Sequence, residues 1–207
     1  MAVETTAFSN NNADTWFRDI MSDCVLCPRA CHVNRLAGQT GYCGQTAELM
    51  AARASLHYWE EPCISGTSGS GTVFFSGCTL RCCFCQNSLL SKDHFGKKLT
   101  VNELGDAFLR LQDKGAYNIN LVTPTQFFPD IIKTLDLVRH KLHIPVVCNC
   151  GGYERPEIIS QLKDYINIWL PDFKYFDNEL AFRYSKAKDY FEQASASIAQ
   201  MIHQTGA

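Results

Sequence analysis

The sequence has no excess of charge, because its 19 lysines and arginines nearly balance 21 aspartates and glutamates, for a net charge of −2. Such a balance gives no basic footprint for nucleic acid or for an anionic membrane surface. No apolar stretch approaches the ~20 residues that a membrane helix needs, and the polar, acidic start lacks the basic and apolar regions of an export leader. We therefore expect a cytoplasmic protein that has neither nucleic acid nor membrane as a partner.

Cysteine, by contrast, is abundant: the chain has eleven in 207 residues. Most of them fall in two clusters, over residues 24–43 and 78–85. Since no export signal precedes them, we interpret the clusters as metal ligands rather than disulfides. The predicted organisation is a polar tail and Cys-rich metal-binding segment over residues 1–62, loosely ordered to about residue 20, followed by one core domain over residues 63–207.

Strands and helices alternate in the core domain. The apolar runs predict strands at residues 72–76, 119–122, 144–148 and 166–170. Helical spacing and capping residues predict helices from Thr100 to Gly115, from Pro129 to Val138, from Pro156 to Leu162 and from about Asn178 to Met201. Repeated strand–helix units indicate an α/β fold with a parallel sheet, either open or closing into a barrel.

A C-x3-C-x2-C motif, formed by Cys78, Cys82 and Cys85, begins two residues after the first predicted strand. Three thiolates suit an iron–sulfur cubane, and they leave one of its four irons open for another ligand. The position fits as well, because ligands of parallel α/β folds gather at the carboxyl ends of strands. The alternatives are a zinc knuckle or three buried thiols. Cys83 interrupts the motif, and we expect it to be a buried thiol.

The motif, with the aromatic Phe84 before its last cysteine, resembles the signature of the radical S-adenosylmethionine (SAM) superfamily. The segments GTVFFSGC, CQN, VTPTQ and LPDFKY are similar to the branch related to the pyruvate formate-lyase activating enzymes, and the resemblance spans about residues 24–205. It implies a 4Fe-4S cluster whose open iron binds SAM and whose electron cleaves SAM to a 5′-deoxyadenosyl radical. It also implies a flavodoxin- or ferredoxin-like electron donor and a glycyl radical protein as the target.

The resemblance further implies a partial (β/α) barrel. Relatives have six strand–helix units, whereas four are found here, so we expect a barrel truncated after the fourth unit, preceded by the loop-rich Cys segment. The runner-up function is a non-catalytic iron–sulfur or zinc protein, a truncated remnant of such an enzyme.

Loops after the predicted strands supply the expected SAM contacts, together with Phe84. Thr123 and Thr125 stand where the wider superfamily has a Gly-Gly-Glu segment, and the alternative is an ordinary Pro-containing turn. Asn149 precedes paired glycines that let backbone approach a ligand. Asp172 and Lys174 share one face beyond the last strand, where the resemblance places them against SAM; the alternative is an internal ion pair.

Cys24, Cys27, Cys31 and Cys43, hereafter the N-terminal cysteine group, are spaced C-x2-C-x3-C-x11-C. Four thiols in so short a segment suffice for a zinc site or a second iron–sulfur cluster, and spacing does not choose between them. The alternative is four free thiols. We interpret Cys148 and Cys150 as core thiols and Cys63 as incidental.

Overall fold

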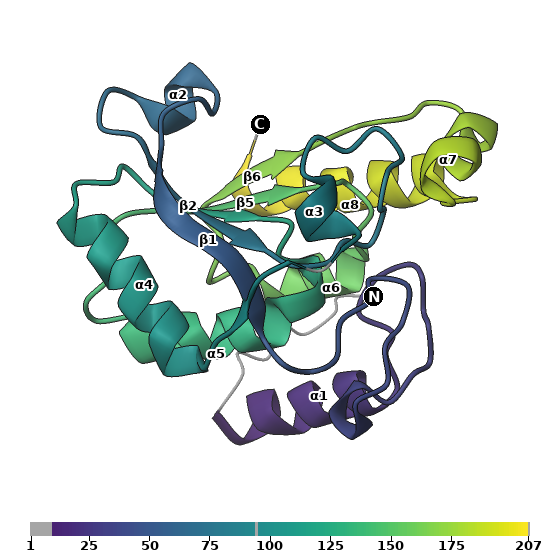
Figure 1. The fold of residues 1–207 in the computed structure, drawn as a ribbon, viewed down its shortest axis with the longest axis horizontal. Helices are drawn as coiled ribbons and strands as arrows, with labels where there is room; N and C mark the ends of the chain where they lie inside the picture. Colours follow the sequence, from purple (N-terminus) through teal and green to yellow (C-terminus); the bar gives the residue numbers. More distant parts are fainter. Residues whose placement is uncertain (1–9, 94, 207) are drawn as a thin grey trace.

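The computed structural model describes residues 10–93 and 95–206, with side chains from Thr15 onward. Within this part of the chain a six-stranded mixed sheet occupies the centre, in the order β3-β1-β2-β4-β5-β6 (Figure 1). The strands are β1 (Met50–His57), β2 (Ser70–Phe75), β3 (Lys97–Lys98), β4 (Ile119–Val122), β5 (Val146–Cys150) and β6 (Ile168–Pro171). The longer helices are α1 (Asn10–Ser22), α4 (Val101–Asp113), α5 (Phe128–Val138), α6 (Pro156–Gln161), α7 (Asn178–Ser185) and α8 (Tyr190–Thr205). Short turns of helix are η1 (Arg35–Ala37), α2 (Pro62–Ser65), α3 (Ser88–Ser91) and η2 (Thr125–Phe127).

The four predicted strands are present as β2, β4, β5 and β6, and they are parallel neighbours in that order. Helices α4, α5 and α6 follow the first three, which confirms the α/β alternation. Thr100 caps α4 in a capping box with Glu103, and Pro129 lies in the first turn of α5, where its missing N–H costs no hydrogen bond. The helix starts that the sequence predicts at Thr100 and Pro129 are therefore confirmed.

Three expectations about the elements were wrong. The sheet is mixed rather than all parallel, because β1 pairs antiparallel with β2, and β3 pairs antiparallel with β1. β1, which precedes the predicted division after residue 62, pairs with β2, which follows it, and the division itself stays a prediction. Residues 10–20, expected to be loosely ordered, belong to α1. The single helix expected from about Asn178 to Met201 is divided into α7 and α8, because Lys186 ends α7 in a left-handed conformation (φ 55°). Residues 1–9 lie outside the described part.

The two faces of the sheet differ. On one face, Val73, Leu121 and Cys148 pack with α4, α5 and α6 in the main core, where Cys150 is also buried, as predicted for both thiols. On the opposite face, one register row near the carboxyl ends of the four parallel strands is only half-buried: Phe74, Val122, Asn149 and Leu170. This open row at the carboxyl ends of the strands is where the fold can receive a ligand.

No helix in residues 10–93 and 95–206 has the length and apolar character needed to cross a membrane.

Candidate metal and cofactor site

The C-x3-C-x2-C motif lies in the loop that follows the carboxyl end of β2, hereafter the cysteine loop (residues 78–85). Cys82 is buried, and Cys78 and Cys85 pack against the same small cluster of apolar side chains. Burial, together with the nearby Cys82 and Cys85, raises the pKa of the Cys78 thiol to about 11, against the effect of the Leu80 N–H, which donates to Cys78 Sγ at 3.3 Å. The Cys78 thiol therefore keeps its proton unless a metal replaces it.

Two hydroxyl groups form a chain of hydrogen bonds that ends at Cys82. Ser185 Oγ donates a hydrogen bond to Cys82 Sγ at 2.9 Å, and the Tyr175 hydroxyl lies 2.6 Å from Ser185 Oγ. This chain of hydrogen bonds fixes the orientation of the sulfur and would stabilise negative charge on it.

The residues between Cys82 and Cys85 face outward. Cys83 is exposed, not buried as expected, because its N–H is held by the Tyr184 carbonyl while the two neighbouring cysteines turn inward. Phe84 is 59% exposed and meets the rings of Tyr175 and Tyr184 edge-on.

The loop after β4 begins with a strained residue. Thr123 has φ 56°, a left-handed conformation that β-branched residues rarely adopt, and its N–H donates to Asn149 O at 2.9 Å. The Gln126 amide donates to the Thr123 and Ser76 carbonyls, both at 2.8 Å. Gln126 therefore fixes the ends of β2 and β4 together, immediately before the cysteine loop. Backbone strain of this kind is concentrated at functional sites.

Thr125 is buried, and its hydroxyl donates to Glu154 Oε1 at 2.9 Å. Glu154 is only 1% exposed, and its Oε2 has no hydrogen-bond partner among the described residues. Burial raises the pKa of this carboxyl group to about 7, against the opposing effect of the Thr125 hydrogen bond. The Thr125 hydroxyl is thus already used by the protein.

The remaining predicted contacts lie beside the open row of the sheet. Asn149 Nδ2 donates to Glu60 Oε2 at 3.4 Å. Asp172 and Lys174 form an ion pair with each other. The buried Tyr190 hydroxyl joins the loops after β5 and β6, because it accepts the Lys174 N–H and lies 2.8 Å from both the Gly151 and Asp172 carbonyl oxygens.

A cavity of about 340 Å³ opens on the same face of the sheet as the half-buried row. Phe74 and Arg53 line it from the sheet, and Gln86 and Asn87, which directly follow the last cysteine of the motif, line it from the loop. Its volume is that of a small-molecule site. The cavity lies on the β1 side of the cysteine loop, whereas Asn149 and Asp172 lie on the β5–β6 side. Because β1 was not predicted, the sequence analysis did not include this cavity.

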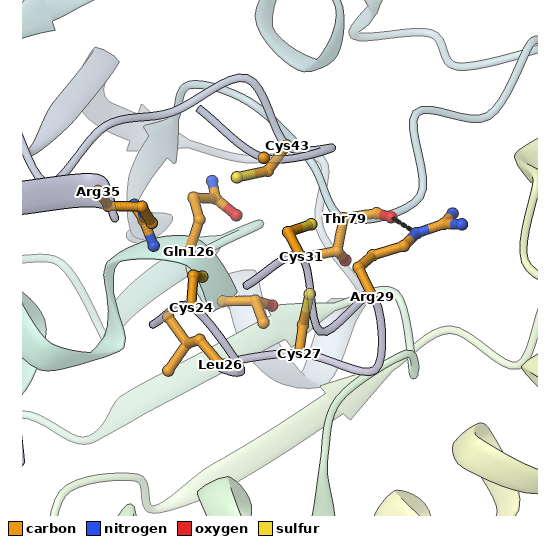
Figure 2. Close-up of a pocket in the computed structure, with 11 residues that line it drawn as sticks. Cys24, Leu26, Cys27, Arg29, Cys31, Arg35, Cys43, Thr79 and Gln126 are labelled. Atoms are coloured by element: carbon orange, nitrogen blue, oxygen red, sulfur yellow. Dashed lines mark hydrogen bonds between the residues drawn. The ribbon is translucent and has the colours of Figure 1, made fainter. Parts of the chain in front are cut away.

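The N-terminal cysteine group surrounds a second, smaller cavity, which Figure 2 shows with the four sulfur atoms around it. Burial raises the pKa of Cys27, and the other three thiols raise it further. Thr79 and Thr125 also line this cavity, so the group packs directly against the cysteine loop and the loop after β4. Among the described residues, no three His, Cys, Asp or Glu side chains are already arranged to hold a metal ion.

Residues 72–202, well over half of the chain, match the radical SAM superfamily. The chain belongs to this superfamily. An uncharacterised protein of Methanocaldococcus jannaschii is 33% identical over 184 residues, which cover 84% of this chain and 52% of that protein. The chain thus spans about half the length of this relative. No solved structure gives a significant match.

Membership of the radical SAM superfamily implies a 4Fe-4S cluster and SAM, and the donor set fits such a cluster. Three inward-facing thiols lie in one loop at the carboxyl end of the first parallel strand, with Ser185 donating to one of them. Those thiols stay a prediction as cluster ligands, and the sequence analysis did not include Glu154, Tyr175 and Ser185, which lie among the predicted site residues. Nothing in the sequence indicates that Ser185, about a hundred residues away, reaches Cys82.

Proposed function

We propose that this protein is a radical SAM enzyme that reductively cleaves SAM to methionine and a 5′-deoxyadenosyl radical. The observation that carries the proposal is the inward grouping of the three motif cysteines at the carboxyl end of β2, inside the segment that matches the superfamily. When bound, the cluster supplies the electron that breaks the carbon–sulfur bond of SAM. Cys78, Cys82 and Cys85 would hold it.

The other residues of the site would bind and orient SAM. Asn149 and the pair Asp172–Lys174 border the open face of the sheet with polar groups that can contact an amino acid and a ribose. Lys174 is the less exposed member of the ion pair, so a ligand carboxylate would compete with Asp172 for it. Phe84 and Thr123 complete the proposed contacts, the first by its ring and the second by backbone held in a strained conformation.

The test is an anaerobic reconstitution with iron and sulfide, followed by incubation with SAM and dithionite. The expected result is 5′-deoxyadenosine formation by the unchanged protein and its loss in Cys82→Ala. Cys83→Ala is the matched control, because the neighbouring Cys83 is exposed and points away from the other thiols. A cluster that forms while SAM stays intact would overturn the enzymatic proposal.

A glycyl radical protein is the target that we propose, with a flavodoxin- or ferredoxin-like protein as the electron donor. The support is the similarity of VTPTQ and LPDFKY to the branch related to the pyruvate formate-lyase activating enzymes. Incubation with SAM and a candidate target should give the electron paramagnetic resonance doublet of a glycyl radical on that target. Formation of 5′-deoxyadenosine without this signal would support SAM cleavage but contradict the proposal that the tested glycyl radical protein is the target.

A non-catalytic iron–sulfur or zinc protein is the second candidate function. It is favoured by one observation, namely that expected SAM contacts already have partners within the protein: Asp172 pairs with Lys174, and Thr125 donates to Glu154. The SAM assay above separates the two functions, because only an enzyme forms 5′-deoxyadenosine.

A further inference from the structure

We propose that the N-terminal cysteine group binds a second metal centre in which all four thiolates are ligands, and that Arg35 offsets part of its negative charge. The centre is either a zinc ion or an iron–sulfur cluster, which share this ligand chemistry. The inference does not rest on the proposed enzymatic function, because it concerns thiols outside the C-x3-C-x2-C motif.

The first argument is convergence. The four cysteines come from two separate stretches, residues 24–31 and residue 43, yet all of them line one cavity of about 10 Å³ (Figure 2). The backbone closes tightly around it: a Cβ atom placed on Gly41 would lie 2.8 Å from Cys31 Sγ, and the Tyr42 N–H donates to the same sulfur at 3.3 Å. A backbone N–H directed at sulfur favours the thiolate that a metal needs.

The second argument is charge. Arg35 lines the cavity and acts electrostatically on the Cys43 thiol, and among the described residues no carboxylate lines it. Arg35 is 1% exposed, and its guanidinium donates to the Thr46 carbonyl at 2.6 and 3.2 Å, which leaves its charge uncompensated by that contact. Asp130 also acts on Arg35 but lies outside the cavity lining. A buried cation beside four neutral thiols would be costly, whereas a metal bound by four thiolates carries a net negative charge that offsets it.

The third argument is the lack of regular secondary structure in the segment. Residues 23–49 contain one short turn of helix, η1, and no strand, so their chain is fixed by side-chain and loop contacts alone. A metal bound by four thiolates stabilises loop-rich segments of this kind, and its binding releases the thiol protons to solvent.

The test removes the first site and asks whether metal remains. The variant Cys78→Ala/Cys82→Ala/Cys85→Ala, purified anaerobically, should keep about one zinc, or about four irons with as much sulfide, per chain. Adding Cys27→Ala and Cys31→Ala should abolish that metal, whereas adding Cys63→Ala, which changes an exposed thiol outside both groups, should not. Metal content that is unaffected by the loss of Cys27 and Cys31 would overturn the proposal.

A second measurement uses the intact protein and does not depend on how the variants fold. Alkylation followed by mass spectrometry should find Cys27 and Cys31 protected as isolated and reactive after a chelator has stripped the metal, while Cys63 and Cys83 react in both states. Zinc and iron counts on the same samples identify the metal. If stripping leaves the reactivity of Cys27 and Cys31 unchanged, the four thiols are free and the second centre does not exist.

Discussion

The carboxyl group of Glu154 lies beneath the ends of β4 and β5, with one oxygen bound to Thr125 and the other without a partner among the described residues. Its pKa is about 7 in the fold, against an ordinary 4.5, because burial penalises the charged form. Between these two values the folded protein binds more protons than the unfolded chain does. The free energy of unfolding should therefore fall as the pH rises from about 4.5 to about 7.

Glu154→Gln should flatten this pH dependence, because the amide does not ionise and still offers an oxygen to Thr125. Each unit of pKa shift corresponds to about 1.4 kcal/mol. The difference in the free energy of unfolding between the two proteins should therefore change by up to ~3 kcal/mol between about pH 4.5 and pH 7. Urea unfolding of both proteins at pH 5 and pH 8 measures it. Parallel pH profiles would show that Glu154 ionises normally.

Ser185 is the second residue with a specific expectation. Its Oγ–H donates to Cys82 Sγ, and such bonds stabilise the more negative, reduced state of an iron–sulfur cluster. Ser185→Ala should therefore shift the reduction potential of the reconstituted cluster to a more negative value. A redox titration followed by electron paramagnetic resonance tests this, with the exposed Ser160→Ala as a control. An unchanged potential would mean that the Ser185 hydrogen bond does not reach the cluster ligand.

At the scale of elements, α4 depends on its N-terminal cap. The Thr100 hydroxyl accepts the Glu103 N–H at 3.2 Å, and Glu103 Oε2 accepts the Thr100 N–H at 2.7 Å. Thr100→Ala removes the first of these bonds and should lower the free energy of unfolding by about 1 kcal/mol. Asn102→Ala, an exposed change in the same turn, should have no such cost. Urea denaturation compares them, and equal midpoints would argue against the cap.

The elements that the sequence predicted are those with a strong local signal. TVFFS and INLV are apolar runs, and Thr100 with Glu103 marks a helix start, so β2, β4 and α4 were found. β1 was missed because MAARASLH alternates poorly and lies half exposed. α1 was missed because its first residues are polar, and its inward face consists of few side chains, such as Ile20 and Met21. Tertiary contacts decide these two elements, and local pattern does not reveal them.

At the scale of the whole molecule, Arg29 connects three distant parts of the chain. Its guanidinium donates to the Thr79 carbonyl at 2.9 Å, to the Ser185 carbonyl at 2.7 Å and to the Lys186 carbonyl. Its Cζ lies 3.8 Å from the centre of the Tyr42 ring. The N-terminal segment, the cysteine loop and the end of α7 are thus held together by one side chain.

Arg29→Gln should loosen that junction, since a hydrogen bond to a charged group contributes about 1.5–3 kcal/mol. We expect faster amide hydrogen exchange over residues 24–44 and 78–85, with little change in α4 and α5. Arg110→Gln, on the exposed face of α4, is the matched control. Exchange that is unchanged in both segments would show that other contacts suffice.

Junctions of this kind limit what the sequence could predict about the site. The motif thiols lie within eight residues of one another, so their grouping followed from spacing alone. The partners of Arg29 are backbone carbonyls up to 157 residues away, and any residue type offers a carbonyl. The position of the N-terminal cysteine group against the cysteine loop therefore needed the structure.

The Tyr190 hydroxyl, which meets three backbone groups from the loops after β5 and β6, has a mechanical consequence. Because the ring is fully buried, no water can replace a contact that breaks, so the two loops resist separation. Opening this end of the sheet would have to shift α8 and both loops as a single rigid body. The β5–β6 side of the site is therefore its rigid wall, whereas the cavity beside β1 is open.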